Sequence, residues 1–198
     1  MIRSWKVNIN NFEYQFRALT CIDVIIGLPE VIPVDNATST TVSQAFEDNW
    51  SIRYPSPVRC IHDNGNEFLG PAFSSMLYKH KIKSIPTSIK NPQSNAIVEQ
   101  MHQSINTMIA IGIRENPPRN FEDVFTLIFR KCMAAQYAVR TTANTTLKYT
   151  PGELVFGRDM ILPVTSTINW NHLFQRKQNV ITKTNLQENK SREILITK

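Results

Sequence analysis

The chain has 198 residues and a mass of 22.7 kDa, which fits one domain or one domain with a tail. Hydrophobic residues make up 41% of it, enough to bury a sizeable core, so a wholly disordered chain is excluded. The formal net charge is +6, a basic balance that suits a polyanionic partner without proving one. Three cysteines are too few for a disulfide scaffold and favour a reduced, intracellular setting.

Membrane insertion is not expected from the sequence. The chain contains no run of about 18 apolar residues, the length that a membrane-spanning helix requires. Its first six residues, MIRSWK, lead into polar sequence rich in Asn and lack the apolar region of a signal peptide.

The first part of the chain has the pattern of β-strands. The stretch 5–10 alternates, with its apolar residues on one face and Asn8 on the other. The apolar run 16–26 is typical of a buried central strand, and 30–34 reads as a third short strand. Strands that follow one another so closely predict an antiparallel meander.

A helix is predicted next, over residues 36–53. Asp35 is its expected N-cap, because a carboxylate there can accept hydrogen bonds from the free N–H groups of the first turn. Two prolines within 54–57 end the helix. Residues 58–62 then read as a short buried strand that runs into a polar turn.

The remaining elements are mainly helices. Pro71 can begin a helix over 71–81, and 82–86 reads as another short strand. After a polar loop, apolar residues spaced by three and four predict a long helix over 94–115. A further apolar helix is predicted over 121–140.

This order of elements predicts an α/β protein, with a mixed sheet and helices packed on it. Towards the C-terminus the composition shifts to Asn, Gln, Lys and Thr. We therefore expect a folded core over residues 1–165 and a polar, basic tail or linker over 166–198.

Two carboxylates stand out as candidate metal ligands. Asp63 lies where a predicted buried strand ends, and Glu99 lies early on the polar face of the long predicted helix. Such a pair can converge on a hard divalent cation, and two such ions support phosphoryl transfer. The alternative is that Asp63 stabilises a turn and that Glu99 is a solvated helix residue.

The sequence around both carboxylates resembles that of retroviral and retrotransposon integrases. IHDNGNEF at 61–68 is similar to the motif of the second catalytic aspartate, and NPQSNAIVEQMHQSI at 91–105 is similar to that of the catalytic glutamate. The 35 intervening residues are the spacing that this family uses. Segments 20–50 and 149–163 also look like integrase segments, the latter as in Ty3/gypsy-type elements. The resemblance covers about residues 5–165.

The resemblance implies an RNase H-like fold with a mixed five-stranded sheet, here with a shortened N-terminal strand region. It also implies a DDE triad in which Asp63 and Glu99 are the second and third members and hold Mg²⁺ or Mn²⁺. The implied reaction is DNA strand transfer, in which a 3′ hydroxyl attacks a target phosphodiester. The expected partners are DNA and a second copy of the chain, with no membrane or small-molecule substrate and a nuclear location when acting on DNA.

The first acidic position is the departure from the family pattern. The position that matches the family's first aspartate is Asn8, and Asp23 is the alternative. A neutral amide oxygen can bind a metal but brings no charge, so Asn8 would make the metal site poor.

Several side chains near this site are candidate nucleic-acid contacts. Lysines near the loop before the long helix can contact phosphates, and polar residues of the helix lie close to Glu99. The set is Lys79, Lys83, Lys90, Asn95 and His102. An ordinary solvated surface explains the lysines equally well.

Three functional hypotheses follow. The first is an integrase-type core with weak or no strand-transfer activity, because of Asn8. The second is a catalytically inactive, integrase-derived module that binds nucleic acid or another partner. The third is an active enzyme in which Asp23 supplies the first ligand, and the orientation of Asp23 distinguishes it from the others.

Overall fold

The computed structural model describes residues 1–9, 11–87, 93–143, 149–158 and 160, with a few single positions between 171 and 182. The chain divides into two compact units. The larger unit comprises Met1–Cys21 and Glu30–Gln136, and the smaller unit comprises Ile22–Pro29 and Tyr137–Lys198. The boundary at 165 falls outside the described residues and stays a prediction.

The N-terminal strands form the predicted meander. Strands β1 (Ile2–Ile9), β2 (Phe12–Ile22) and β3 (Pro29–Val34) lie in the order β1-β2-β3. β1 and β2 are antiparallel, with Ile9 opposite Phe12, so only two residues connect them. Asn11 has a φ of 65°, and Asn is among the residues that best tolerate this left-handed conformation in a tight hairpin.

The other two strands form a separate sheet, which corrects the prediction of one five-stranded sheet. β4 (Arg59–His62) and β5 (Lys83–Pro86) are parallel and pair over their whole length. Among the described residues, no edge of this pair is hydrogen-bonded to the β1-β2-β3 sheet. The sequence pattern identified the strands, but alternation says which face is buried and not which strand is the neighbour.

The first helix begins later than predicted. α1 (Ser39–Phe46) has Thr38 as its N-cap, not Asp35, and it continues into a π-helical turn, η1 (Glu47–Ser51). The Thr38 backbone is extended, and its hydroxyl accepts a hydrogen bond from the N–H of Thr41 at 3.3 Å. Thr38, three residues after the predicted cap, therefore caps the helix.

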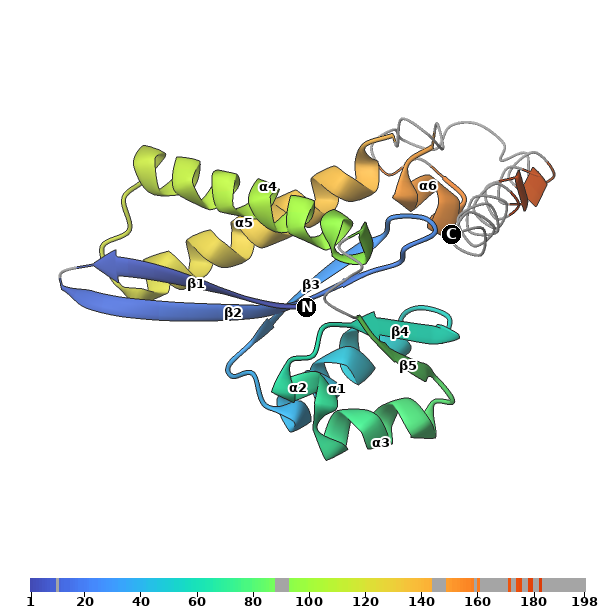
Figure 1. Cartoon of the computed structure of the whole chain (residues 1–198). Helices are drawn as coiled ribbons and strands as arrows, with labels where there is room; N and C mark the ends of the chain where they lie inside the picture. The colour runs from blue at the N-terminus through green and yellow to red at the C-terminus, as the bar shows by residue number, and fades with distance from the viewer. Residues whose placement is uncertain are drawn as a thin grey trace, which may run out of the picture. The chain divides into compact units, whose positions relative to one another are not determined.

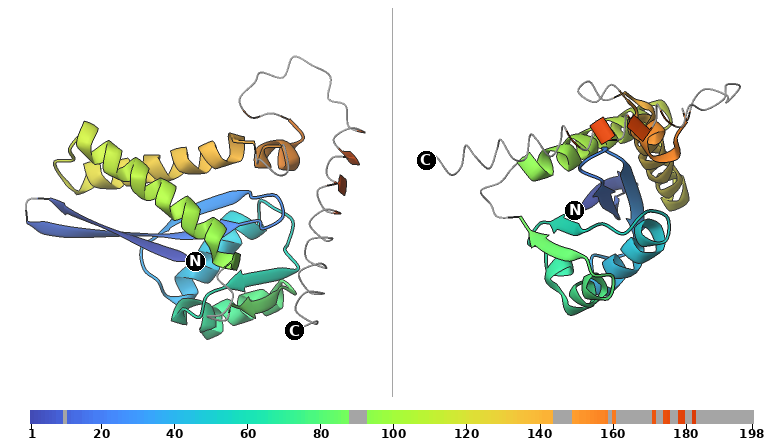
Figure 2. Two further views of the ribbon diagram at one scale, coloured as in Figure 1. Left: turned by 45° about the horizontal axis from the view of Figure 1, so that its top comes forward. Right: turned by 90° about the vertical axis from the view of Figure 1, so that its right-hand side faces the viewer.

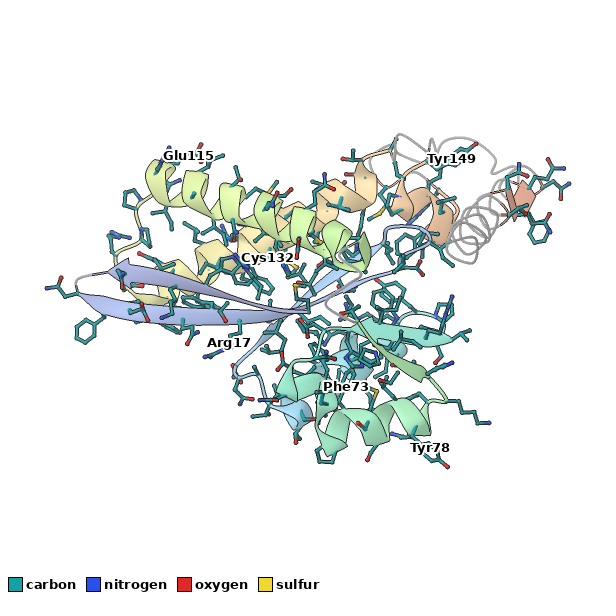
Figure 3. The ribbon with its side chains drawn as sticks, viewed as in Figure 1. Arg17, Phe73, Tyr78, Glu115, Cys132 and Tyr149 are labelled. Atoms are coloured by element: carbon teal, nitrogen blue, oxygen red, sulfur yellow. The ribbon has the colours of Figure 1, made fainter. Side chains whose placement is uncertain are left out.

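A hydrophobic cluster holds α1, β2 and β3 to the segments around β4. Helices α2 (Asn66–Leu69) and α3 (Pro71–Lys79) contribute to it, and Phe73 of α3 is only 1% exposed. Figure 3 shows Phe73 among the side chains of this cluster. The buried members are Leu19, Ile32, Val34, Val42, Ala45, Phe46, Trp50, Phe68, Phe73, Met76, Leu77 and Ile82.

Two long helices cover one face of the β1–β2 hairpin. α4 (Gln93–Glu115) and α5 (Phe121–Thr141) lie on the same side of it and cross each other at an angle in Figures 1 and 2. Trp5 of β1 donates a hydrogen bond to α4, and Phe16 of β2 stacks on Phe121 of α5 at 5.6 Å. Because Trp5 and Phe16 are paired across the strands, they identify the covered face.

The smaller unit contains the short helix α6 (Pro151–Phe156). Thr150 caps its N-terminus, and Gly157, with a φ of 77°, ends it in the left-handed conformation that favours glycine. In this unit the Arg140 guanidinium donates to the carbonyl of Pro29 at 2.9 and 3.2 Å. None of the helices in the described ranges has the length and apolar character needed to cross a bilayer.

Candidate functional site

Asp63 lies directly after β4 and is half-buried. Its Oδ1 accepts a hydrogen bond from the N–H of Gly65 at 3.2 Å, which makes a tight Asx-type turn before α2. Asp63 therefore stabilises a turn, as the alternative interpretation of the sequence predicted. It leaves Asp63 at the carboxyl end of a parallel strand, where α/β proteins commonly place functional side chains.

His62 fixes the strand end that carries Asp63. The His62 ring is 4% exposed and contacts Phe68 and Phe73, with ring centroids 5.5 and 5.8 Å away. Its Nδ1 lies 2.8 Å from the carbonyl oxygen of Asp63, and its Nε2 lies 2.8 Å from Oγ of Ser84 on β5. Since a carbonyl only accepts, Nδ1 carries the proton and donates to Asp63. The sequence around His62 does not predict that its ring holds Asp63 and Ser84 in place.

Glu99 lies on α4 and is exposed, as predicted for a residue on the polar face. The buried side of the helix carries Met101, Ile105 and Ile109, which are 4%, 0% and 5% exposed. Their spacing of four residues forms one apolar seam that packs inwards. Burial of this seam leaves Glu99 facing out of the core.

The structure does not bring Asn8 to Glu99. Side chains alternate along β1, and Trp5 and Val7, which lie on the face that α4 and α5 cover, are buried. Asn8 is exposed on the opposite face, paired with Glu13 near the tip of the hairpin. A side chain on that face points away from α4.

The register of α4 on the hairpin separates the two residues further. Trp5 contacts Asn106 of α4, and Asn8 lies three residues beyond Trp5, about 10 Å along the strand. His102 contacts Thr20, which is paired with Met1, so α4 and β1 run in the same direction. Glu99 therefore precedes the Trp5 contact and Asn8 follows it.

Arg3 is an exposed residue of β1, two positions before Trp5. Side chains alternate along a strand, so Arg3 lies on the same face of β1 as Trp5. Burial lowers the pKa of the His102 imidazole, and the positive charges of the N-terminus and then of Arg3 add to that effect. The face of β1 that carries Trp5 thus also carries the cation of Arg3.

Asp23 closes the turn that follows β2. Its Oδ1 accepts hydrogen bonds from the N–H groups of Ile25 and Ile26 at 2.8 and 3.1 Å. The N–H of Asp23 donates to Leu28, so the strand ends at Ile22 and not at 26 as predicted. These contacts assign Asp23 a local structural role in the smaller unit.

The described residues do not complete the metal site that the resemblance implies. Within the described ranges, no three His, Cys, Asp or Glu side chains lie close enough together to hold one ion. Asp63 and Glu99 remain the predicted ligands, and Asn8 is not placed to join Glu99.

The predicted nucleic-acid contacts have different outcomes. Lys83 is exposed on β5, whereas the Lys79 ammonium is engaged 3.0 Å from Oε1 of Glu47. Lys90 and the Asn95 side chain lie outside the described residues.

His102 is a correction to the predicted contacts. Its side chain is 3% exposed, and its Nε2 hydrogen-bonds with Oγ1 of Thr20 at 2.8 Å. Burial, the N-terminal ammonium and Arg3 lower its pKa to about 4, so it is neutral near pH 7. The structure therefore corrects the expectation that His102 is open to a phosphate, because its ring is buried against Thr20.

Comparison with known proteins supports the resemblance in sequence. The chain is 29% identical over 154 residues to the Retrovirus-related Pol polyprotein from transposon 412 of Drosophila melanogaster. The matched region covers 78% of this chain and 12% of the polyprotein, so the chain corresponds to a small part of that relative. No protein-family model matches the chain.

Solved structures support the resemblance in fold. The magnesium complex of the HTLV-2 integrase catalytic core domain, in its trimeric form, superposes with a TM-score of 0.56 at 16% identity, covering 77% of this chain and 91% of that one. The catalytic core domain of BIV integrase gives 0.56 at 16% identity, covering 79% and 93%. A simian T-cell lymphotropic virus intasome, bound to PP2A regulatory subunit B56 gamma, gives 0.59 at 15% identity, covering 84% and 56%.

The resemblance to integrase catalytic cores that the motifs predict is therefore confirmed. The chain has the RNase H-like α/β fold of those cores, although its described strands form two sheets. Its similarity to the transposon polyprotein extends over most of the chain.

Proposed function

We propose that this chain is an integrase-type core whose reaction class is metal-dependent DNA strand transfer, and that its own activity is weak or absent. Weak or absent activity is inferred from Asn8, the residue that matches the family's first catalytic aspartate. Asn8 is exposed on the face of the hairpin away from α4, and Arg3 is on the strand face that carries Trp5, which contacts α4. A cation there opposes the binding of a divalent ion.

Asp63 and Glu99 are the residues we assign to the reaction. As carboxylates they would supply two of the three ligands that Mg²⁺ or Mn²⁺ would have in an intact triad, and the metal would stabilise the charge that develops on the phosphate. His62 would hold the strand end that carries Asp63. Within the described residues no third carboxylate joins them, so the donor set there is incomplete.

A strand-transfer assay in Mn²⁺ tests the proposal. We expect the unmodified chain, Asn8→Asp and Asp23→Asn to give the same background level of product. Arg3→Asp should raise the product about tenfold or more, because it replaces a cation with a carboxylate on the face beside α4, and tenfold corresponds to only about 1.4 kcal/mol. Addition of Glu99→Gln should remove that gain.

Two results would contradict these assignments. Strong activity of the unmodified chain that Asp23→Asn abolishes would make Asp23 the first ligand. A gain from Asn8→Asp alone would mean that the β1–β2 hairpin adopts another register when DNA is bound.

A nucleic-acid-binding module without chemistry is the second candidate, and the exposed Lys83 favours it. We expect Lys83→Ala to weaken the binding of duplex DNA and to lower the slope of log K against log salt by about 1. Lys79→Ala should do less, because its ammonium already pairs with Glu47. Fluorescence anisotropy over a KCl series measures both, and equal effects would contradict the distinction.

The proposed function also implies macromolecular partners and a cellular location. DNA is the proposed macromolecular partner, and self-association follows by analogy with the trimeric and dimeric forms of the HTLV-2 core. A nuclear location when acting on DNA would accompany this activity. The tail beyond residue 165 is proposed as a linker or a further nucleic-acid contact.

A further inference from the structure

Two polar contacts join α4 to the β1–β2 hairpin within an otherwise apolar interface. His102 Nε2 lies 2.8 Å from Oγ1 of Thr20 on β2. Four residues further along α4, Asn106 Oδ1 accepts a hydrogen bond of 2.7 Å from Nε1 of Trp5 on β1. Thr20 and His102 are 2% and 3% exposed, so their contact is buried. The Trp5–Asn106 contact is partly buried, because Trp5 is 7% exposed and Asn106 is half-buried.

The spacing of these residues relates them to Glu99. His102 and Asn106 follow Glu99 by three and seven residues, which are the intervals that share one face of an α-helix. The apolar seam of Met101, Ile105 and Ile109 lies beside this polar line. An apolar seam tolerates sliding by a turn, whereas a buried hydrogen-bonding group must find its own partner.

We propose that the contacts His102–Thr20 and Asn106–Trp5 form a polar clasp that sets the register and rotation of α4, and so positions Glu99. Thr20, His102, Trp5 and Asn106 are positioning residues under this proposal. The functional importance of the clasp rests on the proposed role of Glu99. Its effect on the packing of α4 does not depend on that role. A slip of one residue would rotate position 99 by about 100° around the helix axis.

A distance measurement tests the clasp without metal, DNA or activity. Spin labels are attached to Ser4→Cys on β1 and Glu99→Cys on α4, which are both exposed positions. Burial raises the pKa of the Cys21 and Cys132 thiols to about 12 and that of Cys60 to about 11, so labelling near pH 7 favours the introduced thiols. Chains with one introduced cysteine control for labelling at the native thiols.

Matched variants separate the clasp from general packing. We expect the doubly labelled chain to give one narrow distance distribution, and Thr20→Val or His102→Leu to broaden or shift it. Thr20→Ser and His102→Gln should restore the parent distribution, since each keeps a polar atom where the contact is made. Ile109→Val trims the apolar seam and should lower the thermal stability without changing the distance.

The outcomes decide the proposal. An unchanged distribution in both Thr20→Val and His102→Leu would overturn it, and so would a change in Ile109→Val as large as theirs. If either of those two variants fails to fold, Asn106→Leu removes the acceptor of the Trp5 N–H at a half-buried position and should broaden the distribution by itself. Failure of the strand-transfer assay leaves this measurement intact, so the two proposals can fail separately.

Discussion

Replacing Phe73 with alanine should lower the free energy of unfolding by about 3–5 kcal/mol, the cost that deletion of a buried phenylalanine ring usually carries. Phe73 is 1% exposed and its ring contacts Phe46, His62 and Phe68 at centroid distances of 6.3, 5.8 and 5.2 Å. Removal of the ring leaves a cavity beneath His62, whose own ring holds the Asp63 carbonyl. A loss of this size is a large part of the stability of a typical domain.

Tyr78 provides the matched control on the same helix. Its side chain is 87% exposed and points away from the cluster in Figure 3, so Tyr78→Ala should change the stability by no more than about 0.5 kcal/mol. Urea denaturation followed by tryptophan fluorescence measures both variants. A loss of less than about 1 kcal/mol in the free energy of unfolding for Phe73→Ala would mean that Phe73 of α3 does not pack against His62 of β4.

The long helices were predictable because their signals are local. The predicted ranges 94–115 and 121–140 differ by one residue from α4 and α5. The periodic apolar residues of each helix and the prolines between the two helices set where both helices begin and end. These signals lie within residues 94–140. No distant partner had to be known.

The strand and cap errors arise where several local signals compete. The apolar run 16–26 continues past Asp23, yet the Asp23 carboxylate binds the next N–H groups and ends β2 at Ile22. Asp35 and Thr38 are both acceptable N-caps in sequence, and the cap is Thr38, whose backbone is extended and whose hydroxyl accepts from the N–H of Thr41.

Asn8 shows how two kinds of sequence reasoning can disagree. Alternation over 5–10 already placed Asn8 on the polar face, away from the buried residues of the strand. The match to the family motif placed it in the catalytic site instead. The structure agrees with the alternation, because a residue cannot change its face without a shift of the whole register.

His102 could not be assigned from its own helix. It stands on the polar side of α4, where a histidine is read as a solvent-facing residue. Its partner, Thr20, lies 82 residues earlier in the chain, and that separation carries no signal in one sequence. Burial of His102 follows from tertiary packing alone.

The free energy of unfolding should fall as the pH decreases from about 6.5 towards 4. In the folded chain the pKa of His102 is lowered from 6.5 to about 4, chiefly by burial and then by the positive charges of the N-terminus and Arg3. Between these two values the unfolded chain binds a proton that the folded chain does not. Acid therefore favours unfolding by about 1.4 kcal/mol per pH unit within this window, up to roughly 3 kcal/mol.

His102→Gln isolates this contribution, because glutamine keeps a polar atom towards Thr20 but does not titrate. Denaturation at pH 7 and pH 4.5 should give a stability loss about 2–3 kcal/mol smaller in His102→Gln than in the unmodified chain. Carboxylates that titrate in the same range act on both chains and cancel in this difference. If both chains lose the same stability, His102 is solvated in solution, and the contact that fixes α4 to Thr20 is not formed.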